Sequence, residues 1–469
     1  MIFRQFEAEG LSHYSYLVGC PGAGKAAVID PRRDIDIYLN EAEKEGVRIA
    51  YVLETHIHAD YASGARELAE ATGAELLVSA YDKGETYEVK FPHSDVRDGE
   101  SLQLGSVRIE AIHTPGHTPE HLSFIVIDES RSSTTPALML SGDFLFVGSL
   151  GRPDLLGEEA KAKLAESLYH SSRERLAPLP DGLEFYPGHG AGSLCGTGMS
   201  ARSLSTLGYE RSTNPSLEER LQRDGFVEKI LSTVPPFPEY YLRMKKINSE
   251  GPPLLKGLPG NRKLSLEQFR REIDSGAVVL DTRDQSAYGG GHIPKSFGIG
   301  LDPKLSVWAS WVLPYDKPLL LVLDEPAHWM QASRALIRVG LDNVRGWLKG
   351  GFASWRESGL PIVQTPQISA ETLQANVQAN GGWAVIDVRT MEEWKAGHIP
   401  GSVHIMGGEL PKRLDEIPRN DKPIAVVCRT GYRSTVAASI LERAGFTGIY
   451  NITGGMEAWN ASGLPTYQV

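Results

Sequence analysis

Short apolar runs alternate with segments of helical spacing along the whole chain, which predicts α/β and α+β architecture rather than an all-helical or all-strand fold. In the N-terminal half, each predicted strand ends at a turn signal or at a cluster of polar, chemically useful residues. These predicted strands cover residues 27–30, 51–54, 107–110, 124–127 and 138–140. Further apolar runs at 319–323 and 424–427 predict buried strands in the C-terminal half.

The C-terminal half contains an internal repeat. Asp281-Thr-Arg matches Asp387-Val-Arg, and Gly291-His-Ile-Pro matches Gly397-His-Ile-Pro, with 106 residues between matching positions in both cases. A Gly-Gly pair followed by Trp355 recurs before Trp459, 104 residues later. Matches in register at several positions indicate two copies of one α/β domain of about one hundred residues.

The stretch from 235 to 262 is rich in proline and glycine, with Pro-Pro-Phe-Pro and Gly-Pro-Pro, and this composition is typical of a linker. Together with the repeat it predicts a multidomain chain. We expect a first domain over 1–240, a linker over 241–261, and two repeated domains over 262–362 and 363–469.

Composition narrows the functional classes. The 469 residues exceed a single core and fit about three domains. A net charge of −11 argues against nucleic-acid or anionic-membrane partners. Residues 1–6 do not form a signal peptide, and three scattered cysteines do not form a disulfide framework, so we expect a cytoplasmic protein.

Gly19-Cys-Pro-Gly-Ala-Gly-Lys25 has the spacing of a phosphate-binding P-loop. That motif requires a following Ser or Thr and then a helix, whereas Ala26 has no hydroxyl and begins an apolar run. Pro-Gly-Ala-Gly between two strands predicts a hairpin turn, and we reject nucleotide binding here.

Ligand-type side chains follow several of the predicted strands. Thr55-His-Ile-His-Ala-Asp60 comes directly after the second strand, and further candidates recur at later strand ends. Neutral imidazoles and carboxylates bind zinc and non-haem iron, and such clustering predicts a metal site rather than isolated structural histidines. The candidates are His56, His58, Asp60, His113, His117, Asp143 and His189.

In the order of these motifs, residues 1–240 resemble the metallo-β-lactamase superfamily. The resemblance implies a four-layer αβ/βα sandwich with the metal where the strand-end loops meet. Many superfamily hydrolases bind two metals and have His after the Asp of the first motif, but here Asp60 is followed by Tyr61. We therefore expect one occupied site, and two histidines with one carboxylate suit Fe(II) and O₂ chemistry.

The segments Glu54–Asp60, His113–His117 and Gly148–Asp154 look like those of the persulfide dioxygenases, including the arrangement fused to rhodanese domains. This resemblance implies one Fe(II) per chain, with Zn as the alternative, and a substrate-binding Arg152. It implies His56, His117 and Asp143 as ligands, surrounded by His58, Asp60, His189 and Tyr61.

Cys195 follows His189 closely and is a candidate for binding or relaying sulfur. That role requires an exposed thiol of low pKa. The alternative is a small, buried and chemically inert side chain, which is the more common role of a lone cysteine.

A second reactive centre is predicted at Cys428-Arg429-Thr-Gly-Tyr-Arg433, between an apolar strand and a helix. Successive backbone N–H groups at such a junction form an anion cradle that stabilises a thiolate. We expect Cys428 to be the nucleophile, Arg433 to supply a fixed positive charge and Arg429 to bind substrate.

This loop, with the Asp-Val-Arg and Gly-His-Ile-Pro motifs, resembles the rhodanese sulfurtransferases. Four residues separate Cys428 from Arg433, whereas tyrosine phosphatases have five, and the tighter loop favours sulfur over phosphate. The first repeat has no cysteine between Leu323 and Arg334, and Asp324 lies nearest the expected nucleophile position. We expect 262–362 to be a catalytically inactive rhodanese-like domain.

The combined interpretation is a bifunctional enzyme that oxidises low-molecular-weight thiol persulfides with O₂ to sulfite and transfers sulfane sulfur through Cys428, giving thiosulfate. One alternative is a zinc thioester hydrolase of the glyoxalase II type fused to a sulfur-relay rhodanese. In another, the repeats deliver sulfur to a carrier protein. We expect small-molecule partners and a homo-oligomer.

Overall fold

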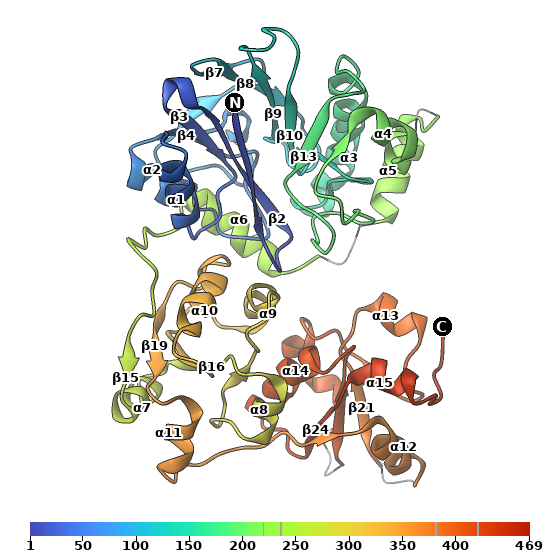
Figure 1. The fold of residues 1–469 in the computed structure, drawn as a ribbon. Coiled ribbons are helices and arrows are strands. Elements are labelled where there is room, and N and C mark those ends of the chain that lie inside the picture. The colour runs from blue at the N-terminus through green and yellow to red at the C-terminus, as the bar shows by residue number, and fades with distance from the viewer. Residues whose placement is uncertain (219, 235–236, 380–381, 420–421) are drawn as a thin grey trace. The chain divides into compact units, whose positions relative to one another are not determined.

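The computed structural model describes residues 1–218, 220–234, 237–379, 382–419 and 422–469 (Figure 1). It divides into two compact units, Met1–Lys256 with Ile337–Gly340, and Gly257–Leu336 with Leu341–Val469. Pro235 and Pro236 of the predicted linker composition lie outside the described residues. No described helix has the length and apolar character needed to cross a membrane.

The first unit is built on two six-stranded sheets. The strands of the first sheet are, in order, β1 (Ile2–Ala8), β2 (His13–Cys20), β3 (Lys25–Ile29), β4 (Arg48–Leu53), β5 (Glu75–Ser79) and β6 (Ser94–Val96). Those of the second are β14 (Ser205–Thr206), β13 (Glu184–Pro187), β10 (Leu138–Gly142), β9 (Leu122–Asp128), β8 (Val107–His113) and β7 (Ser101–Leu104). The predicted strands are confirmed, and β11 (Leu145–Phe146) pairs with β12 (Ser149–Leu150) beside them.

Both faces of each sheet are covered, which explains why the strands contain long apolar runs. In β2, Val18 packs into the core between the sheets, and its neighbour Leu17 packs into an outer core. That outer core is shared with α1 (Asp36–Lys44) and α2 (Ala65–Thr72). The second sheet packs on α3 (Glu158–His170) and α5 (Arg223–Ser232), with α4 (Leu207–Thr213) beside them. This confirms the four-layer sandwich.

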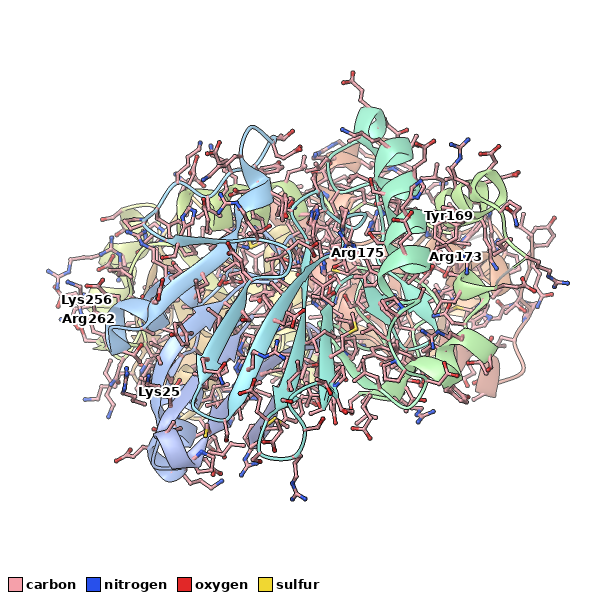
Figure 2. All side chains as sticks on the ribbon, turned by 90° about the horizontal axis from the view of Figure 1, so that it is seen from above. Lys25, Tyr169, Arg173, Arg175, Lys256 and Arg262 are labelled. Atoms are coloured by element: carbon pink, nitrogen blue, oxygen red, sulfur yellow. The ribbon has the colours of Figure 1, made fainter. Side chains whose placement is uncertain are left out.

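A cation–π contact follows the end of α3. Tyr169 and Arg173 lie close together on this segment (Figure 2). The Arg173 guanidinium is 5.6 Å from the centroid of the Tyr169 ring, and it also donates to the carbonyl oxygens of Leu217 and Glu218. These contacts connect the end of the helix to the chain that leads into α5.

The glycine-rich segment before β3 forms a turn between two strands, as predicted. A short 3-10 turn (Pro21–Ala23) joins β2 to β3, and Gly24 takes a left-handed conformation with φ 60°.

The segment predicted as a linker differs from the expectation. Its first half forms α6 (Tyr240–Glu250), and the first unit continues to Lys256. Tyr241, Met244, Lys245 and Asn248 on this helix are buried. The apolar and polar positions at helical spacing thus outweigh the prolines on either side, which lie outside the helix.

The second unit contains two parallel five-stranded sheets. The first is ordered β15 (Lys263–Leu264), β19 (Val344–Leu348), β18 (Leu319–Val322), β16 (Val278–Asp281) and β17 (Phe297–Gly298). The second is ordered β20 (Gln367–Ile368), β24 (Ile449–Ile452), β23 (Ile424–Val427), β21 (Ala384–Asp387) and β22 (Val403–His404). Corresponding strands occupy corresponding positions, which confirms the repeat.

Helices also recur in the two repeats. Those of the first repeat are α7 (Leu266–Asp274), α8 (Gln285–Gly290), α9 (Leu305–Val312), α10 (His328–Ile337) and α11 (Gly351–Glu357). Those of the second are α12 (Ala370–Gln378), α13 (Met391–Ala396), α14 (Tyr432–Arg443) and α15 (Gly455–Ala461).

The repeated Asp-x-Arg motif has a structural role in both copies. Asp281 and Arg283 form a buried ion pair at 2.6 Å, and Asp387 and Arg389 form the matching pair at 2.7 Å. Each arginine also donates to a backbone oxygen of the Gly-His-Ile-Pro segment. Because a buried charge is stable only when it is paired, the two sequence motifs occur together.

Sheet register corrects one expectation. Asp281 is aligned with Val322 and the matching Asp387 with Val427, so the residue that corresponds to Cys428 is Leu323. Asp324 corresponds instead to Arg429. Leu323 continues the apolar run of the strand by one residue, so the sequence alone places the strand end after Leu323, whereas the pairing ends at Val322.

Candidate metal centre and cysteine loop

The predicted metal ligands come from three strand ends. His56 follows β4, His117 follows β8, and Asp143 follows β10. All three are buried, and one ligand atom from each lies within 4.8 Å of the others. The structure therefore brings together the three residues that the sequence motifs indicated.

The two histidines are held with their Nε2 atoms free. His117 Nδ1 donates to the Arg152 carbonyl oxygen at 2.8 Å. His56 Nδ1 lies 2.9 Å from the Thr55 hydroxyl, which itself donates to Asp30. Burial holds the pKa of both imidazoles well below the usual range, so each keeps a lone pair on Nε2.

The geometry fits a metal ion. His56 Nε2 and His117 Nε2 lie 3.9 and 3.4 Å from Asp143 Oδ2, too far apart for hydrogen bonds. Ligand atoms about 2.1 Å from a shared ion are separated by about 3 to 4 Å. These same three buried atoms have no hydrogen-bond partner among the described residues. An ion accounts for all three.

Sequence reasoning missed His121, which positions Asp143. His121 Nε2 accepts a hydrogen bond from the Asp143 backbone N–H at 3.0 Å, and its Nδ1 contacts the Thr114 hydroxyl at 2.8 Å. His121 lies four positions after His117, just beyond the His113–His117 motif. No known ligand spacing in the sequence indicated a role for it. Its tautomer is set by the acceptor role at Nε2.

His189 bridges two carboxylates on the other side of Asp143. Its Nδ1 lies 2.7 Å from Asp143 Oδ1, and its Nε2 lies 2.7 Å from Asp60 Oδ2. Burial alone would lower the pKa of His189, but the charges of Asp143 and Asp60 raise it to about 10. Both ring nitrogens therefore lie within hydrogen-bond distance of a carboxylate. Asp60, His189 and Cys195 form a second buried group whose ligand-type atoms lie within 4.8 Å of one another.

Tyr61 and His58 complete the surroundings of the first motif. The Tyr61 ring lies 4.5 Å from that of His58, and its hydroxyl donates to the Asp30 carbonyl oxygen. His58 Nε2 is 3.0 Å from Glu54 and 3.2 Å from Asp30. Although burial opposes the charge, these carboxylates raise the pKa of His58 well above its usual range. Both side chains support the loop that carries His56.

Arg152 and Cys195 lie close to the metal ligands but are occupied or enclosed. Two guanidinium nitrogens of Arg152 donate to Asp154 and a third donates to the Leu194 carbonyl oxygen. Cys195 is buried, with its sulfur 3.7 Å from the Tyr241 hydroxyl, and burial raises the pKa of its thiol well above the usual range. Substrate binding by either residue stays a prediction.

In the second unit, Cys428 lies between β23 and α14, as expected. The Gly431 backbone N–H donates to the Cys428 sulfur at 3.1 Å, and the Ser434 oxygen lies 3.3 Å from it. The sulfur thus lies within hydrogen-bond distance of two donors just before the 12-residue helix α14. Ser434 was not singled out by its sequence context.

The two arginines of the loop differ in their surroundings. Arg433 forms a bidentate pair with Glu393, with both distances at 2.6 Å. Although burial opposes ionisation, Arg433 lowers the pKa of Glu393 to about 2. Arg429 is more exposed and pairs with Glu457. A positive charge therefore lies beside the loop, and its direct contact with substrate stays a prediction.

Comparison with known proteins identifies the family of the chain. The metallo-beta-lactamase superfamily model matches residues 8–189, and the rhodanese-like domain model matches 265–358 and 369–462. A solved metallo-beta-lactamase from Staphylococcus aureus subsp. aureus COL is 36% identical, with a TM-score of 0.65, and the match covers 74% of this chain and 98% of that one. The chain belongs to the metallo-β-lactamase superfamily.

Two curated relatives of this superfamily domain differ in activity. "Persulfide dioxygenase ETHE1, mitochondrial" of Bos taurus is 29% identical over 223 residues, covering 46% of this chain and 76% of the relative. A hydroxyacylglutathione hydrolase of Methylococcus capsulatus is 32% identical over 213 residues, covering 45% of this chain and 72% of the relative. Together with the two rhodanese-like domains, these matches give the fused architecture that the sequence motifs indicated.

The first rhodanese-like domain packs against the cysteine loop of the second. The Tyr432 hydroxyl donates to the Gly300 carbonyl oxygen at 3.0 Å, and His292 contacts Glu442 of α14 at 2.8 Å. A Cβ atom on Gly431 would lie 2.6 Å from the Gln285 side-chain oxygen. The first domain thus contacts both the loop and the helix that position Cys428.

The same register explains why the first rhodanese-like domain lacks the anion cradle. Counting from Leu323 at the Cys428 position, Pro326 corresponds to Gly431, whose N–H donates to sulfur. Proline has no N–H. The domain therefore lacks both the cysteine and one of the N–H groups that donate to its sulfur.

We predict that Leu323→Cys, made in a Cys428→Ser background, restores no measurable sulfur transfer from thiosulfate to cyanide, because Pro326 cannot donate to the new sulfur. The matched control is Leu323→Cys in the wild-type background, which should keep the transfer rate of the wild-type protein. Transfer by the first variant at a tenth or more of the wild-type rate would contradict this interpretation of the first domain.

Proposed function

We propose that this protein oxidises a low-molecular-weight thiol persulfide to sulfite at the His56, His117 and Asp143 centre. It would also transfer sulfane sulfur through Cys428 to form thiosulfate. The observation that carries the first activity is the open set of two neutral imidazoles and one carboxylate, beside a His189 that is held between two carboxylates. Such a set suits Fe(II).

Bound Fe(II) would supply electron transfer between the persulfide and O₂. The overall reaction, R–S–SH plus O₂ plus H₂O giving R–SH and sulfurous acid, balances in atoms. The chain's own residues orient the ligands: Thr55 and the Arg152 carbonyl fix the two imidazoles, and His121 fixes the Asp143 backbone. Burial of all three ligands limits water at the centre.

At Cys428, the thiolate would attack the outer sulfur of a persulfide and release the thiolate R–S⁻. The resulting cysteine persulfide would pass its outer sulfur to sulfite, which gives thiosulfate and regenerates the thiolate. The Gly431 N–H, 3.1 Å from the sulfur, and the start of α14 stabilise negative charge in both states. The sulfite needed here is the product of the first centre.

The alternative is a zinc-dependent thioester hydrolase of the glyoxalase II type, which the similarity to hydroxyacylglutathione hydrolase keeps open. Two features favour the dioxygenase. Tyr61 stands where many two-metal hydrolases have a second histidine, and His189 has both nitrogens engaged by carboxylates. We place the protein in the cytoplasm as a homo-oligomer, as the sequence interpretation proposes.

We predict that Asp143→Ala abolishes iron retention and persulfide-dependent oxygen uptake, because the carboxylate is the only anionic ligand of the set. Metal analysis and an oxygen electrode measure the two effects. Asp224→Ala, at a surface side chain that is 89% exposed, is the control and should change neither. Iron and oxygen uptake at wild-type levels in Asp143→Ala would remove this residue from the ligand set.

We predict that Cys428→Ser keeps oxygen uptake within about twofold but lowers sulfur transfer by at least about 100-fold, because an alcohol cannot carry a persulfide. The product of persulfide oxidation should shift from thiosulfate to sulfite, as measured by chromatography of the bimane-labelled anions. Cys20→Ser is the control substitution and should leave the product ratio unchanged. An unchanged thiosulfate yield in Cys428→Ser would exclude the coupled scheme.

A further inference from the structure

Helix α6 lies against the loop that carries the metal-binding motif. Asn248 Nδ2 donates to the carbonyl oxygens of His58 and Tyr61 at 2.8 and 2.7 Å, and Asn248 Oδ1 accepts from the Ser63 N–H at 2.8 Å. Lys245 Nζ donates to the Ile57 carbonyl oxygen at 2.9 Å. The helix lies beyond residue 189, where the superfamily match ends, so neither the motifs nor the match pointed to it.

Lys245 brings a buried positive charge to the metal centre. Lys245 is buried, with only 1% of its surface exposed. Burial is the main reason that the pKa values of His56 and His117 are low, and the charge of Lys245 lowers both further. Burial lowers the pKa of Lys245, and the charges of Glu120 and Asp143 oppose that effect.

The hydrogen-bonding capacity of this ammonium is only partly used. An ammonium has three N–H donors, and the Ile57 carbonyl is its only hydrogen-bond acceptor in the part of the chain that the structure describes. The Tyr87 ring lies 5.5 Å from Nζ. Glu120 and Asp143 attract the charge from a distance, but no described carboxylate forms a direct ion pair with it. Burying a charge in this way is costly unless an anion compensates for it.

The other buried cations at this site already have partners. Arg152 donates to Asp154 and to the Leu194 carbonyl, and His189 lies between Asp143 and Asp60. Lys245 is therefore the cation near the ligands with the most donor capacity left for an incoming group. The neighbouring Cys195 thiol has a raised pKa, so it stays neutral and does not take that capacity as a thiolate.

We infer that Lys245 binds the anionic sulfur group that reacts at the metal centre, first the terminal sulfur of the persulfide and then sulfite. This inference rests on the proposed function, and it adds the residue that recognises the charge of substrate and product. Lys245 donates to the residue next to His56, and its charge acts on the metal ligands, so we assign it to the reacting sulfur rather than to a distant carboxylate of the thiol. Charge-assisted hydrogen bonds to a buried anion are strong enough to change affinity about tenfold or more.

The test uses the full chain with iron bound, in a Cys428→Ser background so that the cysteine loop does not bind sulfite. Lys245→Met removes the charge at similar length, Lys245→Arg keeps it, and Lys246→Met changes the exposed lysine next to it on the same helix. Oxygen uptake gives KM and kcat for glutathione persulfide, used as the probe substrate. Inhibition by added sulfite gives its binding constant, and metal analysis gives iron content.

We expect Lys245→Met to keep its iron, to raise KM about tenfold or more, and to weaken sulfite inhibition by a similar factor. Lys245→Arg should recover at least part of both, and Lys246→Met should match the background protein. If sulfite inhibition weakens but KM is unchanged, Lys245 binds only the product. If KM rises but sulfite inhibition is unchanged, Lys245 binds only the persulfide. Either result overturns the inference that Lys245 binds both.

Two further outcomes overturn the inference. Loss of iron in Lys245→Met with KM and sulfite inhibition unchanged per bound iron would show that Lys245 only supports the Ile57 loop. KM and sulfite constants equal to the background, with iron retained, would show that it plays no part in binding. Failure of the proposed function is distinguishable, because the background protein itself would then show no persulfide-dependent oxygen uptake.

Discussion

Three buried atoms that point at one another without hydrogen bonds determine the organisation of the first unit. Nε2 of His56, Nε2 of His117 and Oδ2 of Asp143 lie at the ends of three strands, where water cannot reach them. Leaving each such atom unpaired costs about 1 to 3 kcal/mol, and more for the carboxylate. A bound cation removes that cost. The surrounding contacts follow from it, since Thr55, the Arg152 carbonyl and His121 all act to keep these three atoms in place.

Charge balance around this centre links the predicted metal stoichiometry to the predicted substrate. His189 lies between Asp60 and Asp143, and each of its ring nitrogens is 2.7 Å from one of these carboxylates. Lys245 adds a buried positive charge with donor capacity to spare, and this is why we infer an anionic substrate. In the second unit, the sulfur atom is held by a different set of groups. There, one backbone N–H and the start of α14 stabilise the Cys428 sulfur, with the Arg433 and Glu393 pair beside it.

The sequence predicted most of the fold, because strand-end motifs and a repeat with constant spacing are local signals. It also predicted that His56, His117 and Asp143 converge, because each follows the end of a strand, although β4 belongs to one sheet and β8 and β10 to the other. It did not predict α6, whose buried residues lie between proline-rich segments that look like linker. Nor did it predict His121, because an acceptor for a backbone N–H has no spacing rule. The position of Leu323 required sheet register, since a strand end cannot be located to one residue from an apolar run.

The most direct test is metal analysis of protein purified without chelators, combined with oxygen uptake after addition of a thiol persulfide. A single centre of two histidines and one carboxylate predicts about one iron per chain and uptake of one O₂ for each sulfur oxidised. Two zinc ions per chain, with thioester hydrolysis and no oxygen uptake, would contradict the proposed chemistry and favour the hydrolase.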